Sequence, residues 1–149
     1  MSLSDLIRPE VVKVPLAARA KSEVIGELLD VLVDAGRLVG ERERAMNALL
    51  ERESLGSTGL ESGIAVPHAK TDAVRRLTLA IGIAPEGIDF ESADGEPSKL
   101  FFLMLAPPDQ SGPHIEALAE IARLARAPAF LRALAGAGSA QEVVDLLNE

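Results

Sequence analysis

The chain has no cysteine, tryptophan or tyrosine, and only four phenylalanines among its 149 residues. Without cysteine it can form neither a disulfide nor a thiolate metal site, which fits a reducing compartment. Because aromatic residues make up only 3% of the chain, stacking on bases or sugar rings is not expected to be a major binding mode. The core must therefore be built from Leu, Val, Ile and Ala.

Positive charge is also scarce: 15 Lys and Arg stand against 23 Asp and Glu, which gives a formal net charge of −8. Nucleic acids and anionic membranes bind basic surfaces, so neither is an expected partner. No apolar run approaches the roughly 20 residues that a membrane helix needs. The first residues lack the basic-then-apolar pattern of a signal peptide. We therefore expect a cytoplasmic protein without direct membrane insertion.

The length and the apolar content of 48% suit one ordinary domain with a proper core, so residues 1–149 are expected to form a single domain. Strand and helix patterns alternate along the chain. The central strands lack a polar alternation, which is typical of strands buried on both faces. We predict an α/β sandwich, in which a mixed sheet of about five strands carries helices on both faces.

Prolines, glycines and capping residues predict where the elements begin and end. A short turn is expected at Ser4–Ile7, and strands are expected at Val11–Val14, Ile64–Val66, Leu77–Ile83 and Leu100–Leu105. Helices are expected from Ser22 as N-cap to about Ala35, from about Glu41 to Glu53, from His114 to about Ala125, from Pro128 to Leu134, and after Ser139, with Glu142 as its capping-box partner.

One of only two histidines, His68, directly follows the apolar run Ile64–Val66 and Pro67. Proline cannot donate a ladder hydrogen bond, so Pro67 suits the end of a strand and would place His68 on the loop that leaves it. Loops held by a rigid scaffold often carry reactive side chains. Taken alone, a Pro-His pair is more often a surface histidine without a role.

The surroundings of His68 form a larger pattern with three further segments: Glu51-Arg52-Glu53, Gly56-Ser57-Thr58-Gly59-Leu60 and Gly112-Pro113-His114-Ile115. Together with Ala65-Val66-Pro67-His68, they resemble the enzyme IIA domain of the fructose/mannitol class of the bacterial phosphotransferase system (PTS). That class includes the nitrogen-related regulatory members. The resemblance extends from Leu6 to Leu147.

This resemblance implies a phosphotransferase component in which His68 accepts a phosphoryl group from the phosphocarrier protein HPr and becomes a phosphohistidine. The group would then pass to an enzyme IIB and finally to an incoming sugar. Neither IIB nor the membrane-embedded IIC is on this chain, so both would be separate polypeptides. The resemblance also implies that His114 lies beside His68, where it hydrogen-bonds the phosphoryl group or sets the environment of the ring.

The chemistry of these residues is compatible with that role. A neutral imidazole carries a lone pair at pH 7, and a phosphoryl-transfer site mainly supplies positioning and charge stabilisation. Arg52, Ser57 and Thr58 are the candidate phosphoryl-binding residues, since they offer a guanidinium fork, hydroxyls and the N–H groups of a glycine-bearing loop. Their plainer interpretation is a solvated arginine and ordinary turn residues.

Two other functions stay open. In the nitrogen-related branch, the phosphorylation state of His68 would control binding to a target protein. A metal hydrolase could use His68 and His114 as ligands, with Asp72 or Asp109 completing the set, but neither carboxylate has a recognisable metal-site spacing to a histidine.

We expect no metal and no cofactor. We also expect a shallow, apolar surface around His68, because it must admit two proteins in turn.

Overall fold

The computed structural model describes residues 3–148. The chain begins with the 3-10 helices η1 (Leu3–Leu6) and η2 (Pro9–Val11). The strands are β1 (Val12–Lys13), β2 (Ile64–Ala65), β3 (His68–Lys70), β4 (Thr78–Ile88) and β5 (Ser98–Ala106). The α-helices are α1 (Lys21–Asp34), α2 (Arg42–Ser54), α3 (Ser111–Leu124), α4 (Pro128–Ala135) and α5 (Ala140–Leu147).

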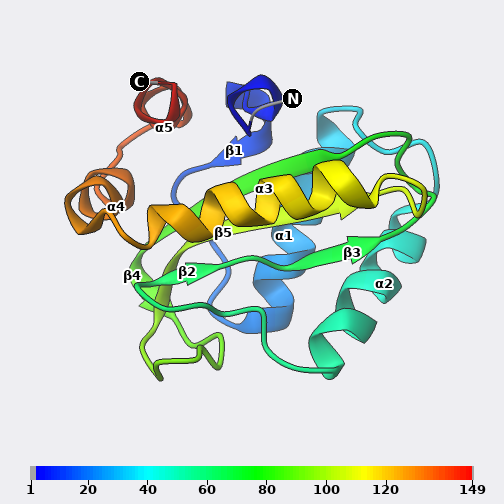
Figure 1. Cartoon of the computed structure of the whole chain (residues 1–149). Helices are drawn as coiled ribbons and strands as arrows, with labels where there is room; N and C mark the ends of the chain where they lie inside the picture. Colours follow the sequence, from blue (N-terminus) through cyan, green and yellow to red (C-terminus); the bar gives the residue numbers. More distant parts are fainter. Residues whose placement is uncertain (1–2, 149) are drawn as a thin grey trace.

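The strands form one mixed five-stranded sheet in the order β1-β4-β5-β2, with β3 also paired to β5 (Figure 1). Only the β4–β5 pair is antiparallel, and the other pairs are parallel. The short strands β2 and β3 follow one another along the same edge of β5, where Ile64 pairs with Leu100 and His68 pairs with Met104. The predicted mixed α/β sheet is confirmed.

Helices cover both faces of the sheet, as predicted (Figure 1). Leu100, Phe102 and Met104 of β5 pack in the cluster that contains buried residues of α3, α4 and α5. The intervening side chains, Phe101 and Leu103 among them, pack in the cluster that contains α1 and α2. Because alternate strand residues point to opposite faces, the continuous apolar run of β5 is explained by two cores.

Gly82 in β4 allows α1 to approach the sheet closely. A Cβ atom at this position would lie 2.9 Å from a Cδ atom of Leu28 and 2.8 Å from both Cδ atoms of Leu16. These distances are shorter than side-chain contacts in packed cores, so a larger residue would push α1 away from β4.

Three predicted boundaries were wrong. Ser22 lies inside α1, whose N-cap is Ala20. The third long helix starts at Ser111 instead of His114, because the first helical turn tolerates Pro113, where backbone N–H groups have no intrahelical partner. His68 begins strand β3 instead of a loop. The cap of α5 was right: Ser139 Oγ accepts from Glu142 N at 3.1 Å.

Candidate functional site

His68 lies on an edge strand that continues past a proline. Pro67 interrupts the ladder, but its carbonyl accepts from Met104 N at 2.9 Å, so the chain stays on the edge of β5. The bend at Pro67 brings His68 Nδ1 within 2.8 Å of the carbonyl oxygen of Val66. A carbonyl can only accept, so Nδ1 carries the proton and Nε2 carries the lone pair.

The second histidine, His114, reaches the same place from α3. The two imidazole rings lie edge to face, with centroids 5.3 Å apart and an interplanar angle of 76°. His114 is only 5% exposed, and its Nε2 is buried without a hydrogen-bond partner among the described residues. Buried polar atoms are nearly always paired, so an unpaired nitrogen beside His68 is an unusual feature of the described structure.

Burial keeps both imidazoles neutral at pH 7. The pKa of His114 is lowered to about 4 by burial and by the nearby His68 and Lys70. The pKa of His68 is also lowered, mainly by burial and further by Arg52, against the opposing effects of the Val66 carbonyl and Glu53. The lone pair of His68 is therefore free at pH 7.

The low pKa of His114 predicts a loss of stability in acid. The unfolded chain binds a proton at His114 below pH 6.5 and the folded chain only below about 4, so stability falls as pH drops through that window. Between pH 7 and 4.5 the wild type should lose about 2 kcal/mol more than His114→Gln. Urea denaturation at both pH values measures this, and equal losses in the two proteins would contradict the buried neutral state.

An open pocket of 420 Å³ surrounds the exposed edges of the two rings. Three of its eight lining residues are the apolar Ala48, Leu55 and Ala69, and three are the charged Glu51, Arg52 and Lys70. Leu55 is 80% exposed and Ile115, next to His114, is 65% exposed. The surface is open, as expected, but the expected apolar character applies only to three of the eight lining residues and to the exposed Ile115.

Arg52 lies at the end of α2 and lines the pocket together with His68 and His114. Its Nη1 donates to the carbonyl of Gly56 at 2.9 Å, so one edge of the guanidinium holds the loop that follows the helix. The remaining donors of a guanidinium stay available to an anion. The three residues Arg52, His68 and His114, far apart in sequence, are thus brought together.

The hydroxyls of Ser57 and Thr58 have other partners. Ser57 Oγ donates to the carbonyl of Phe90 at 2.5 Å and accepts from Gly59 N at 3.0 Å. The buried Thr58 donates its hydroxyl and its N–H to the carboxylate of Glu53. Neither residue lines the histidine pocket. The structure therefore does not bring these two residues to the pocket with Arg52 and the histidines, and it gives their hydroxyls a role in shaping the loop.

Glu53 anchors the loop to the rest of the domain. Besides Thr58, its carboxylate binds Lys21 Nζ at 2.7 Å, and Lys21 lies 5.0 Å from the centre of the Phe90 ring. Although burial lowers it, hydrogen bonds to Glu53 and Glu91 raise the pKa of Lys21 above its ordinary value. From the sequence, Glu53 was identified only as part of the Glu51-Arg52-Glu53 segment. The role of Lys21 was missed, since no local signal links Lys21 to a loop more than 30 positions away.

The loop also pairs with β2 and Val66, immediately before the strand that carries His68. Val66 N donates to the carbonyl of Thr58 at 3.0 Å, and Gly59 forms an antiparallel bridge with Ala65. A Cβ atom on Gly59 would lie 2.6 Å from Ser92 Oγ. Only glycine permits this approach, so Gly59 allows the loop to pack closely against Phe90 and Ser92.

For the phosphoryl-acceptor role that the sequence resemblance implies, replacing Arg52 by lysine is expected to slow phosphoryl acceptance about tenfold or more, because lysine keeps the charge but cannot bind the Gly56 carbonyl and an anion with one planar fork. Stability should change little. Arg44→Lys, on the same helix with an exposed ion pair to Asp72, is the matched control. Stopped-flow transfer rates measure the effect. Equal rates in the two variants would show that Arg52 has no role in transfer beyond that of an ordinary surface arginine.

A metal centre finds no support in this arrangement. Among residues 3–148, no group of three or more His, Asp or Glu side chains could hold a metal ion. Asp72, the carboxylate considered as a third ligand, pairs with Arg44 at 2.8 Å.

Two imidazoles and an arginine thus meet at one pocket on the edge of a mixed α/β sheet. The family model for the phosphoenolpyruvate-dependent sugar phosphotransferase system, EIIA 2, matches residues 5–149. The chain belongs to this family. Within residues 3–148, every helix is too short or too polar to cross a bilayer.

The curated relatives fall into two groups. A fructose-specific EIIA component of Haloferax volcanii is 40% identical over 99% of this chain and 95% of its own length. A nitrogen regulatory protein of Bradyrhizobium diazoefficiens is 36% identical over 99% of this chain and 95% of its own length. A fructose-specific EIIABC component of Bacillus subtilis is 35% identical over the whole chain, which spans 23% of that longer protein.

Solved structures of the same fold agree with both groups. The nitrogen regulatory protein IIA-Ntr of Neisseria meningitidis aligns with a TM-score of 0.83 at 28% identity, covering 97% of this chain and 98% of that one. The enzyme IIA of the mannitol system of Escherichia coli, solved in complex with its phosphorylated IIB, aligns with a TM-score of 0.80 at 27% identity, covering 95% and 96%.

Proposed function

We propose that the chain is a cytoplasmic phosphoryl carrier of the PTS. Nε2 of His68 takes a phosphoryl group from an HPr-type phosphocarrier protein and passes it to an enzyme IIB, for sugar uptake and phosphorylation. The observation that carries the proposal is the paired histidines: the lone pair of a neutral His68 is oriented by the Val66 carbonyl and lies beside the unpaired Nε2 of His114.

In the proposed step, the Nε2 lone pair attacks phosphorus while the phosphorus–nitrogen bond of the donor phosphohistidine breaks and leaves its electron pair on the donor nitrogen. The proton on Nδ1 stays in place. The phosphorylated ring becomes a cation, which the hydrogen bond from Nδ1 to the carbonyl of Val66 stabilises. Since no proton has to leave during the attack, the step needs no general base and can run in either direction.

Arg52 and His114 bind the oxygens of the transferred group in this proposal. Arg52 supplies a permanent positive charge from α2, and His114 supplies a ring N–H from α3, on the other side of the strand that carries His68. The hydroxyls of Ser57 and Thr58 hold the loop between Arg52 and His68, because their hydrogen bonds are already made. Phosphoryl binding through these two residues therefore forms no part of the proposal.

The partner proteins would dock on the open surface around the pocket. Leu55 and Ile115, both exposed, provide apolar contact on opposite sides of the histidines, and the absence of an enclosing wall allows two partners to use the surface in turn. The mannitol IIA–IIB complex, formed by a structural relative, supports an enzyme IIB as one partner of this chain. HPr is proposed as the other from the family's chemistry.

A regulatory function is the second candidate. It is favoured by two nitrogen regulatory relatives: one is 36% identical over 99% of the chain, and the structure of another aligns with a TM-score of 0.83. In that case the phosphorylation state of His68 would control binding to a target protein. The chemistry at His68 is the same, and only the fate of the phosphoryl group differs.

Incubation with phosphoenolpyruvate, enzyme I and HPr, followed by mass analysis, tests the carrier function. One phosphoryl group should be acquired, and peptide mapping should find it on the segment that contains His68. Chase with a fructose-type IIB then separates the two candidates: rapid loss of the group to IIB supports transport, and retention supports regulation. A protein that stays unlabelled under these conditions would contradict both the transport function and the regulatory function.

A further inference from the structure

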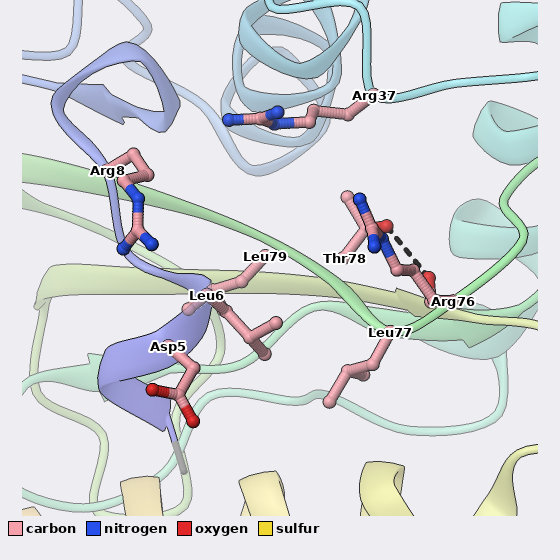
Figure 2. A pocket seen from close by; sticks show the side chains of 8 residues that line it. All are labelled: Asp5, Leu6, Arg8, Arg37, Arg76, Leu77, Thr78 and Leu79. Atoms are coloured by element: carbon pink, nitrogen blue, oxygen red, sulfur yellow. Dashed lines mark hydrogen bonds between the residues drawn. The ribbon is translucent and has the colours of Figure 1, made fainter. Parts of the chain in front are cut away.

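A second cavity, of 310 Å³, lies near the start of β4 and shares no lining residue with the histidine pocket. Three arginines from three separate segments surround it (Figure 2). Arg8 follows η1, Arg37 follows α1, and Arg76 precedes β4. An adjoining hollow adds Arg75 beside Arg37 and Arg76. Such a gathering of positive charge stands out in a chain whose net charge is −8.

The guanidinium groups around this cavity have little neutralisation within the described part of the chain. The closest carboxylate of an ion pair is Glu10, 3.7 Å from Arg37, and Arg8 donates to the neighbouring carbonyl of Ile7. Across residues 3–148, no hydrogen bond or ion pair involves the side chain of Arg76. Asp5 is the one acidic residue in the lining. Positive charges held together in this way repel one another unless an anion joins them.

The shape and chemistry of the cavity select the anion. Guanidinium forks match phosphate oxygens two at a time, and the volume lies at the lower end of the roughly 300–1,000 Å³ of small-molecule sites. Leu6 and Leu79 add apolar lining. A nucleic acid would need a longer basic stripe, and the net charge of −8 argues against one. We propose that Arg8, Arg37 and Arg76 bind a small phosphorylated metabolite.

Calorimetric titration with inorganic pyrophosphate, at about 0.15 M ionic strength, tests the site. The wild type should bind saturably with one site per chain, and a hundredfold excess over the Kd should raise Tm by about 5 to 10 °C. Arg76→Gln and Arg37→Gln should each weaken binding about tenfold or more. The exposed arginine Arg126, which lines neither cavity, gives the matched control Arg126→Gln with unchanged affinity.

Two further readouts make the outcome decisive. Phosphoryl acceptance from HPr should be unchanged in Arg76→Gln, so a failure of this site is distinct from a failure of the carrier function. Succinate should bind much more weakly than pyrophosphate, and equal binding would overturn the phosphate assignment. Absence of saturable binding, or pyrophosphate affinity that survives in both Arg76→Gln and Arg37→Gln, would overturn the site itself. Arg76→Gln is expected to fold, since its side chain is exposed and holds no partner.

Discussion

The variant His68→Ala is expected to accept no phosphoryl group from HPr. In the proposed mechanism, the Nε2 lone pair is the only nucleophile of the site. No cysteine can replace it, and His114 is 5% exposed, so its ring cannot reach a donor on another protein. The effect should therefore be complete, with the labelling signal lost to background.

The fold of His68→Ala should remain intact, because β3 is held by backbone pairing to β5 and by the carbonyl of Pro67. Loss of the Nδ1 hydrogen bond to Val66 should cost only about 1 kcal/mol. Thermal denaturation supplies the folding control, and His68→Gln serves as a second variant that fills the space without a nucleophile. Labelling of either variant at the wild-type rate would exclude His68 from the mechanism.

The variant His114→Ala should still accept a phosphoryl group but should transfer it to enzyme IIB slowly. A phosphohistidine should still form at position 68, because the accepting lone pair is intact. Onward transfer to enzyme IIB should fall about a hundredfold, which corresponds to about 3 kcal/mol of transition-state stabilisation for one positioned donor. The buried Nε2, unpaired within the described structure, is the atom that would supply this stabilisation.

A single-turnover assay on the isolated phosphorylated variant measures this transfer, with peptide mapping to locate the label. His114→Gln, which restores a side-chain N–H near the same place, should recover part of the rate, whereas a purely structural role of the imidazole would leave the two variants equal. Two results would contradict the proposal that His68 carries the phosphoryl group and His114 stabilises its transfer: label on the His114 peptide of the wild type, or full transfer speed in His114→Ala.

Local sequence patterns predicted most elements of the fold because each pattern has a local physical cause. Ser139 caps α5 since its hydroxyl reaches a backbone N–H three residues away, and Pro128 starts α4 since a first turn needs no N–H there. The start of α3 was misplaced, because Ser111, Gly112 and Pro113 are as compatible with a loop as with a first turn. His68 was expected on a loop, because the continuation of a strand past Pro67 depends on its partner, β5.

The residues of the site were partly predictable, because some of them lie in recognisable local motifs. A resemblance in short motifs indicated Arg52, His68 and His114, and the structure places all three around one pocket. Ser57 and Thr58 had the right chemistry and the right neighbours in sequence. Their hydrogen bonds to Phe90 and Glu53 could not be inferred, since Phe90 lies on a different segment and competes for the hydroxyl only after folding.

By itself, the sequence indicated the class of this protein: its composition excludes disulfides and argues against a nucleic-acid surface, and its motifs resemble the family and suggest a histidine as phosphoryl carrier. Only the tertiary structure decided which nitrogen of His68 is free, that the Nε2 of His114 is buried beside it, and that Arg8, Arg37 and Arg76 converge in an acidic chain. These features depend on distances between segments far apart in the chain, and such distances are fixed by packing on both faces of the sheet.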